Sequence, residues 1–174
     1  MIATNHDHRY FSIKGGKVHL DNLYLDRGRS PNGGLIRIDG GEMTITNSKL
    51  RGGWADKNGG AIWMKNSTVT IDNSKLDGSW AYKNGGGIWA KGGKLTITNS
   101  TLYANVARDK GVGGAIFQNG TKLTLNNVTI HHNSAFKGGG IFHDGKNNLS
   151  LNNVTFAYNR AKKKGKGNDI WPEQ

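Results

Sequence analysis

The sequence predicts an all-β fold, a right-handed parallel β-helix of about six coils with a period of about 26 residues. Three observations predict it: an asparagine that recurs once per period, an isoleucine that does the same, and strands in which apolar and polar residues alternate. We expect one solenoid domain over residues 1–174. Repeat coils should fill 17–161, with partial coils or caps at 1–16 and 162–174.

The recurrent asparagine defines the first register, with spacings of 25, 26, 26, 28 and 26 residues. Stacked coils lie about 4.8 Å apart, so identical amides can bond from coil to coil, as they do in cross-β ladders. We expect a structural ladder on the inward side, where a buried Asn99 contributes roughly 1 to 3 kcal/mol. The predicted ladder comprises Asn22, Asn47, Asn73, Asn99, Asn127 and Asn153.

Isoleucine gives the second register, and a pair of glycines precedes it in most coils, as in Gly59-Gly60. Glycine adopts positive φ without steric cost, so these pairs indicate tight turns. A phosphate cradle is disfavoured, because neither a Walker sequence nor a following helix is present. The isoleucine register comprises Ile36, Ile62, Ile88, Ile116, Ile141 and Ile170. An inward column after each asparagine comprises Leu25, Leu50, Leu76, Leu102, Ile130 and Phe156.

The composition bounds the class of protein. Gly contributes 27 residues and Pro only 2, which fits a chain of many turns rather than a disordered tract. The absence of cysteine excludes disulfides and thiolate metal sites. No apolar run is long enough for a membrane span, and the N-terminus lacks the apolar region of a signal peptide. We therefore expect either a cytoplasmic chain or a mature or excised fragment with an added Met, of unspecified oligomeric state.

Two short motifs recur along the chain. The first is Gly59-Gly60-Ala61-Ile62 and Gly113-Gly114-Ala115-Ile116, and the second is Phe156-Ala157-Tyr158-Asn159. They resemble the GGA[ILV] and FxxN motifs of polymorphic outer membrane protein repeats. Leu102 to Asn105 and Ile130 to Asn133 are variants of FxxN, whereas the first three coils carry Gly28, Gly53 and Ser79 in place of its asparagine. The resemblance covers about residues 9–171. It implies a right-handed β-helix in secreted or surface-displayed proteins, often adhesins.

Length variation is concentrated on one side of the predicted solenoid. The spacing from asparagine to the next isoleucine varies between 14 and 17 residues, whereas the return spacing is 11 or 12. Insertions in solenoids collect on one face, which is often the binding face. That side interleaves basic and aromatic residues. The candidate binding residues are Trp54, Lys57, Trp80, Tyr82, Lys83, Arg108, Lys110, Lys137, Lys162, Lys163 and Lys164.

With a net charge of +12, these residues predict a non-catalytic binding or adhesion module for an anionic polysaccharide or another polyanion. Rings would stack on ligand rings while cations meet the anionic groups, and nucleic acid would bind only nonspecifically. The alternative is a solvated lysine face on a structural spacer. A second, outward stripe beside the isoleucines should stabilise the coils by ring stacking. It comprises Arg37, Trp63, Trp89, Phe117, Phe142 and Trp171.

A polysaccharide lyase or glycoside hydrolase is the main alternative function, because many β-helices are such enzymes. Glycosidases need two carboxylates about 5 to 9.5 Å apart. Asp21 and Asp72 lie two coils apart, which is about 10 Å, and so do Asp26 and Asp77, with Arg51 between them. No tight carboxylate pair results, so we expect no catalytic residue.

Neither a metal site nor a cofactor is expected. His131 and His132 are adjacent at a strand end, where neighbouring side chains should face opposite ways. His6 and His8 resemble a terminal metal-binding fragment without further ligands. An ice-binding face is a last alternative. It rests on the outward threonines Thr44, Thr46, Thr70, Thr96, Thr98 and Thr124, although Asp72, Asn126 and Asn152 interrupt one of their two files.

Overall fold

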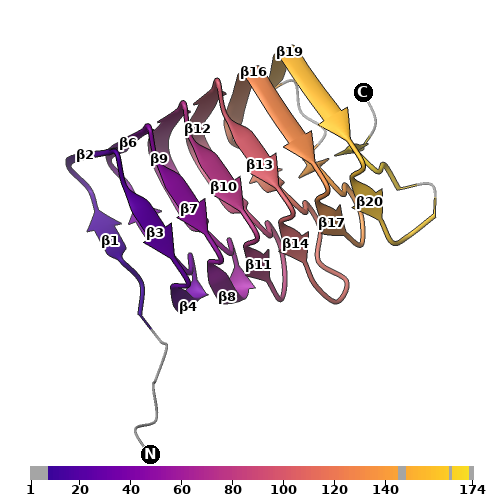
Figure 1. Cartoon of the computed structure of the whole chain (residues 1–174), viewed down its shortest axis with the longest axis horizontal. Helices are drawn as coiled ribbons and strands as arrows, with labels where there is room; N and C mark the ends of the chain where they lie inside the picture. The colour runs from indigo at the N-terminus through magenta and orange to yellow at the C-terminus, as the bar shows by residue number, and fades with distance from the viewer. Residues whose placement is uncertain (1–7, 145–147, 165, 173–174) are drawn as a thin grey trace, which may run out of the picture.

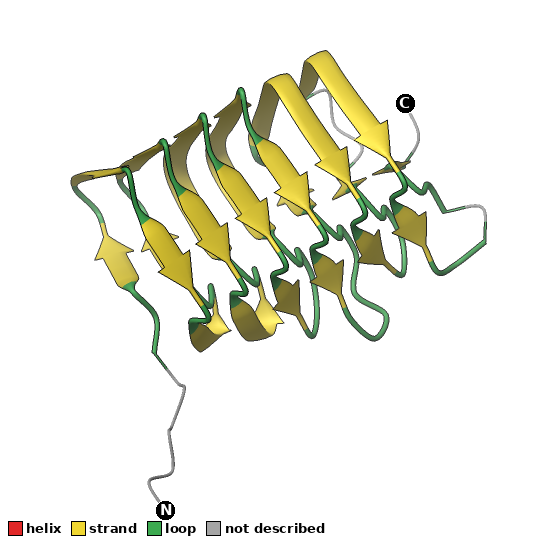
Figure 2. Ribbon diagram, viewed as in Figure 1, coloured by secondary structure: helices red, strands yellow, loops and turns green. Residues whose placement is uncertain are grey.

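The computed structural model describes residues 8–144, 148–164 and 166–172, and they form a right-handed parallel β-helix of about six coils (Figures 1 and 2). The predicted fold class is confirmed. Each coil has four short faces, joined by three tight corners and by one set of longer loops, which we call the loop edge. Among the described residues, the structure contains no helix with the length and apolar character that a membrane crossing requires.

The first and second faces carry the isoleucine and threonine strands. The first face consists of β1 (Phe11–Lys14), β5 (Ile36–Asp39), the start of β9 (Ile62–Asp72), the start of β12 (Ile88–Thr98), β15 (Ile116–Asn119), β18 (Ile141–Phe142) and β21 (Ile170–Trp171). The second face consists of β2 (Lys17–Asp21), β6 (Glu42–Thr46), the ends of β9 and β12, and the starts of β16 (Lys122–His131) and β19 (Leu149–Ala157). The isoleucines pair in parallel register from coil to coil.

The third and fourth faces complete each coil. The third consists of β3 (Tyr24–Asp26), β7 (Lys49–Arg51), β10 (Lys75–Asp77), β13 (Thr101–Tyr103) and the ends of β16 and β19. The fourth is a separate sheet of β4 (Arg29–Asn32), β8 (Trp54–Asn58), β11 (Trp80–Ala81), β14 (Val106–Ala107), β17 (Ser134–Ala135) and β20 (Arg160–Ala161). The end segments, which we expected to be partial coils or caps, each contribute a strand to the first face, because β1 pairs with β5 and β21 with β18.

The core is the stack of inward-facing apolar columns inside the four faces. The column from Leu25 to Ile130 is buried, as predicted, and so are the isoleucines from Ile36 to Ile141. The last coil is less covered, because β19 pairs only with β16. Its Leu151 is 37% exposed, whereas Leu125 at the same register one coil earlier is fully buried. Side-chain burial therefore differs along the solenoid even though the strand pattern does not.

The second corner, between the second and third faces, holds the predicted asparagine ladder. Asn73 donates its amide to Asn47 at 2.8 Å, Asn127 to Asn99 at 2.8 Å, and Asn153 to Asn127 at 2.9 Å. The expectation of an inward, buried ladder is wrong, since all six amides are exposed. Their φ angles lie between 44° and 55°, so each is a one-residue left-handed turn, a conformation that asparagine tolerates better than most residues.

At two steps of this exposed ladder, an aspartate accepts the amide in place of the asparagine of the preceding coil. Asn99 donates to Asp72 at 3.0 Å and Asn47 donates to Asp21 at 2.8 Å. Thr46 also donates to Asp21, and these two hydrogen bonds, Thr46 first, lower the pKa of its carboxyl group. Both aspartates are thereby used in coil-to-coil bonding.

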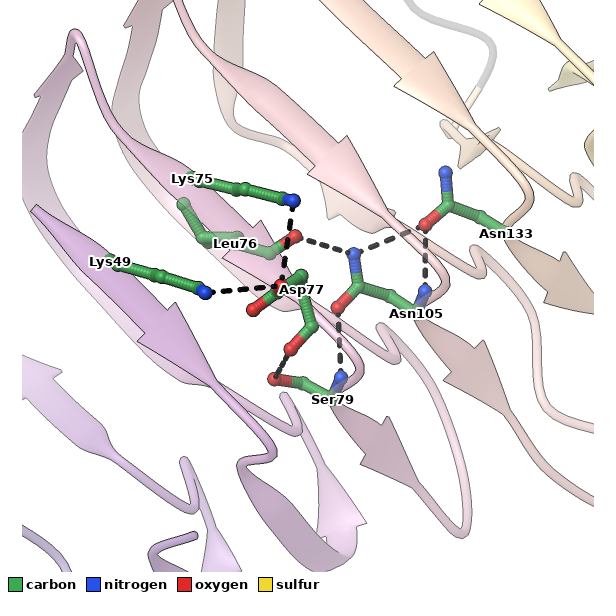
Figure 3. Close-up of polar contacts among 7 residues, drawn as sticks. All are labelled: Lys49, Lys75, Leu76, Asp77, Ser79, Asn105 and Asn133. Atoms are coloured by element: carbon green, nitrogen blue, oxygen red, sulfur yellow. Dashed lines mark hydrogen bonds and ion pairs between the residues drawn. The ribbon is translucent and has the colours of Figure 1, made fainter. Parts of the chain in front are cut away.

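The third corner, between the third and fourth faces, holds a second ladder that is buried (Figure 3). The Asn133 Oδ1 accepts the backbone N–H of Asn105 at 2.9 Å, and the Asn105 Oδ1 accepts that of Ser79 at 3.1 Å. Ser79 Oγ then accepts the N–H of Gly53 at 3.1 Å. The serine therefore continues the line where the FxxN asparagine is missing. The Asn105 amide also donates to the Leu76 carbonyl at 3.1 Å, so this buried side chain is fully paired.

The glycine pairs close each coil at the loop edge. Gly59 has a φ of 66° and Gly113 a φ of 70°, which is the left-handed region. A Cβ on Gly60 would collide with the carbonyl oxygen of Gly86 in the next coil. The first glycine is thus needed for its backbone conformation and the second for the close approach of neighbouring coils.

Candidate polyanion-binding edge

The fourth face positions the predicted binding residues, because the loop edge departs from the small residue that each of its strands places in one register. That residue is Ser30 in β4 and an alanine in the other five strands, Ala55, Ala81, Ala107, Ala135 and Ala161. The backbone stays in register beyond that residue. Arg108 N–H donates to the Ala81 carbonyl at 2.8 Å, and Lys83 N–H donates to the Lys57 carbonyl at 2.7 Å. Lys57 and Lys83 are therefore neighbours in adjacent coils. The loop edge thus presents cations in successive coils, along the solenoid axis.

The loop edge has more cations than carboxylates to balance them. Among the described residues, no ion pair joins a carboxylate to any of the predicted cations of this edge. Asp56 pairs instead with Arg29 of the fourth face at 3.1 Å. Like charges at neighbouring sheet positions destabilise a fold, so this arrangement is unfavourable for the chain on its own. All the predicted cations are exposed except Lys137, which is half-buried.

The two tryptophans lie on the fourth face, and the structure corrects their expected role. The Trp54 and Trp80 rings contact each other, with centroids 3.9 Å apart. The Arg29 guanidinium lies 4.8 Å from the Trp54 centroid, and the Arg108 guanidinium lies 3.6 Å from the Trp80 centroid. Because the rings stack on one another and on the arginines, they do not offer open faces to a ligand ring. Arg29, which the sequence analysis did not single out, is thus part of this stack.

Tyr82 is the aromatic side chain that remains accessible, with 37% of its surface exposed. A shallow hollow beside it is lined by Tyr82, Lys83, Asn84, Asp109, Lys110 and Gly111. Tyr82 lies 6.2 Å from Trp54 between ring centroids, and the Arg108 guanidinium lies 5.9 Å from the Tyr82 centroid, so Tyr82 borders the stack and shares its arginine. This hollow places the accessible Tyr82 ring beside two of the predicted lysines, Lys83 and Lys110, and the Asp109 carboxylate also lines it.

A second hollow lies at the C-terminal end of the loop edge and is lined mainly by lysines. Its lining residues are Ala161, Lys162, Lys163, Lys164, Lys166, Gly167 and Asn168. Lys166 was not predicted; its ammonium lies 4.3 Å from the Trp171 centroid. A rule that selected lysines beside glycine turns would have included it. The cationic edge therefore continues to the last coil.

The second predicted stripe lies on the first face as a ladder of rings. Centroids are 5.1 Å apart for Trp63 and Trp89, 6.0 Å for Trp89 and Phe117, and 5.5 Å for Phe117 and Phe142, with planes within 9° of parallel. The Arg37 guanidinium lies 4.7 Å from the Trp63 centroid. The stripe is half-buried rather than exposed, and Trp63 is only 9% exposed. Ring stacking leaves its edges, and not its faces, to solvent.

The carboxylates weighed for catalysis make other contacts. Asp26 pairs with Arg27 at 2.9 Å, and Asp77 is flanked by the ammonium groups of Lys75 at 3.6 Å and Lys49 at 4.0 Å (Figure 3). Arg51 lies between the two aspartates in register. No group of three or more His, Asp or Glu side chains in the described parts of the chain converges on a metal position. His6 lies outside the described residues, and His8 packs edge-on against Tyr10.

The comparisons with known proteins agree with this architecture. Residues 13–171 match the family described as "Right handed beta helix region". No curated protein and no solved structure matches the chain. The match to the family covers far more than half of the sequence, from β1 to β21. The chain therefore belongs to the right-handed β-helix family.

Proposed function

We propose that this protein is a non-catalytic β-helix module that binds an anionic polysaccharide along its loop edge. One observation carries the proposal: exposed cations occur in successive coils without carboxylate partners among the described residues. A linear polyanion laid parallel to the solenoid axis meets a new coil about every 4.8 Å. Its charges would offset the repulsion between neighbouring cations such as Lys57 and Lys83, which the protein alone does not relieve.

The hollow beside Tyr82 favours an acidic polysaccharide as the ligand over a polyanion that has no sugar rings to pack on the tyrosine. A sugar ring can pack on the accessible tyrosine ring while Lys83 and Lys110 contact its carboxylate or sulfate groups. Trp54 and Trp80 have a supporting role in this proposal, because they hold Arg108 at the edge of the site. An extracellular or surface setting, with adhesion to a glycan, is consistent with the resemblance to outer membrane protein repeats.

An array of sulfated, uronic-acid and neutral polysaccharides, with DNA and RNA included, tests the proposal at two salt concentrations. The loop variant is Lys57→Gln/Lys83→Gln/Lys110→Gln. Its matched control is Lys91→Gln/Lys94→Gln/Lys122→Gln, which removes the same charge from exposed lysines of the first and second faces. We expect the loop variant to lose binding to acidic glycans and the control to keep most of it. Equal losses in both variants would indicate a general effect of net charge and would contradict a site.

Two further readouts on the same array separate the alternatives. Tyr82→Ala should weaken binding to acidic glycans more than binding to DNA, because a ring contact favours the sugar polymer. Incubated polysaccharides should show neither new reducing ends nor unsaturated products. Turnover that Asp77→Ala abolishes would replace the proposal by a lyase or hydrolase function.

A further inference from the structure

Two adjacent histidines at the third corner bring their ring nitrogens together. The Nδ1 atoms of His131 and His132 are 2.9 Å apart, and the ring planes are inclined by 76°. Neighbouring residues of a strand would face opposite ways, but only His131 belongs to β16. His132 has a φ of 57°, and this left-handed turn directs its side chain back toward that of His131. The premise that excluded this pair as a joint site is therefore wrong.

Neighbouring coils hold the two imidazoles in place. The Tyr103 ring packs on His131 from the preceding coil at 4.7 Å, and the Tyr158 ring packs on His132 from the following coil at 5.0 Å, between centroids. Two further neighbours are small. Ala157 follows His131 in register, and Ala104 occupies the same corner one coil before His132. Aromatic contacts thus fix the pair, and small side chains occupy the matching positions of the adjacent coils.

We propose that His131 and His132 form an open chelating site for Cu²⁺ or Ni²⁺. Metal–imidazole bonds are about 2.0 to 2.1 Å long, so two nitrogens at a right angle around the ion lie about 2.9 Å apart. A tetrahedral ion of the zinc type would need about 3.3 Å. The separation in this protein is set by the hydrogen bond between the two nitrogens. It equals the spacing of cis positions around the square-planar or octahedral ions that imidazole binds well, so the nitrogens need not move apart to bind one.

Both Nδ1 lone pairs must be free to bind the ion. Burial, then His132 and Lys75, lower the pKa of His131. In the metal-free pair, one Nδ1 carries the proton of the hydrogen bond. On metal binding that proton moves to Nε2 of the same ring, which frees both Nδ1 lone pairs without net proton loss or a redox step. Water fills the remaining ligand positions, because no third His, Asp or Glu converges there among the described residues.

Copper titration followed by electron paramagnetic resonance tests the site. The starting protein carries His6→Gln and His8→Gln, so that the N-terminal histidines do not bind copper themselves. We expect one Cu²⁺ per chain, with hyperfine coupling to two nitrogens. His131→Gln or His132→Gln should each weaken binding at least about tenfold, since each removes one of two protein ligands. The matched control, His19→Gln, removes an exposed histidine of the second face and should change nothing.

Two outcomes would overturn the assignment. The first is a starting protein that binds no Cu²⁺ at millimolar concentration. The second is binding that persists unchanged in both single variants, which would place the ion elsewhere. Thermal unfolding of each variant serves as the check on folding, and both histidine side chains lie at the surface, so neither substitution should disturb the core.

Discussion

The second corner and the loop edge divide each coil into a constant part and a variable part. The second corner is one left-handed asparagine in every coil, and the chain reaches it 11 or 12 residues after each isoleucine. The loop edge lies within the return segment, which varies from 14 to 17 residues and carries cations that have no carboxylate partner in the described part of the chain. At the loop edge, the residues that the fold requires are chiefly the two glycines that end the loop. The other residues of the loop edge can therefore vary and contribute to binding, whereas the residues at the corners are required for the fold.

The two corner ladders show that the regularity of a residue along the sequence does not measure its contribution to the stability of the fold. The asparagine of the second corner recurs in all six coils, yet its amides are exposed. The third corner changes from Gly53 to Ser79 to Asn105 along the chain, yet Ser79 and Asn105 are fully buried and pair with buried backbone groups. A buried polar group that loses its partner costs more than an exposed one. The less regular ladder should therefore stabilise the fold more.

Of the predicted changes, single-residue insertions should lower the free energy of unfolding most, and they test the division between the second corner and the loop edge. One glycine inserted after Asn99 displaces Ser100, whose hydroxyl accepts the Ser74 N–H at 3.0 Å, and should cost more than about 3 kcal/mol. The same insertion after Lys110 lengthens a turn whose Asp109 and Lys110 are exposed. It disturbs the hydrogen bond from the Gly111 N–H to the Arg108 carbonyl, at 2.7 Å, and should cost only about 1 kcal/mol. Urea unfolding of both variants gives the comparison. Similar costs at the two positions would contradict the division.

Asn133→Ala tests the buried ladder. The substitution leaves the Asn105 N–H and the Leu102 carbonyl without the side chain that pairs with them, and we expect a loss of about 3 kcal/mol in the free energy of unfolding. Asn133→Ser should cost less, since Ser79 shows that a hydroxyl can accept the N–H of the preceding coil at this column. A loss below about 1 kcal/mol for the alanine variant would show that the buried ladder has little weight.

Asn99→Ala should lower the free energy of unfolding by only about 1 kcal/mol. The Asn99 amide is exposed, so the main cost is that alanine tolerates the left-handed turn less well than asparagine. Asn99→Gly should cost less than Asn99→Ala, since glycine adopts this φ freely. Thr98→Ala, on the outward side of the second face, is the control and should stay within about 0.5 kcal/mol. If the glycine variant is as unstable as the alanine variant, amide bonding and not backbone conformation holds this corner.

The sequence predicts the fold well because each coil repeats the same inward columns, and a repeat is visible without any knowledge of backbone angles. It predicts the cations of the loop edge for the same reason. The errors have two physical causes. The first is the positive φ at Asn99 and His132, which breaks the alternation on which inward and outward assignments rest. The second is side-chain conformation, which periodicity does not encode: the Arg29 guanidinium packs on Trp54 of the next coil and covers its ring.

The salt dependence of binding to heparin, as a sulfated probe, tests the central claim most directly. Affinity of the wild-type protein should fall steeply with salt, because exposed cations are screened within about 10 Å at 0.1 M. For Lys57→Gln/Lys83→Gln/Lys110→Gln, the slope of log affinity against log salt should be shallower by roughly 2 to 3, the share of three lost ionic contacts if this polyanion behaves as nucleic acids do. Lys91→Gln/Lys94→Gln/Lys122→Gln should run parallel to the wild type. Equal slopes for the two variants would contradict a binding site on the loop edge.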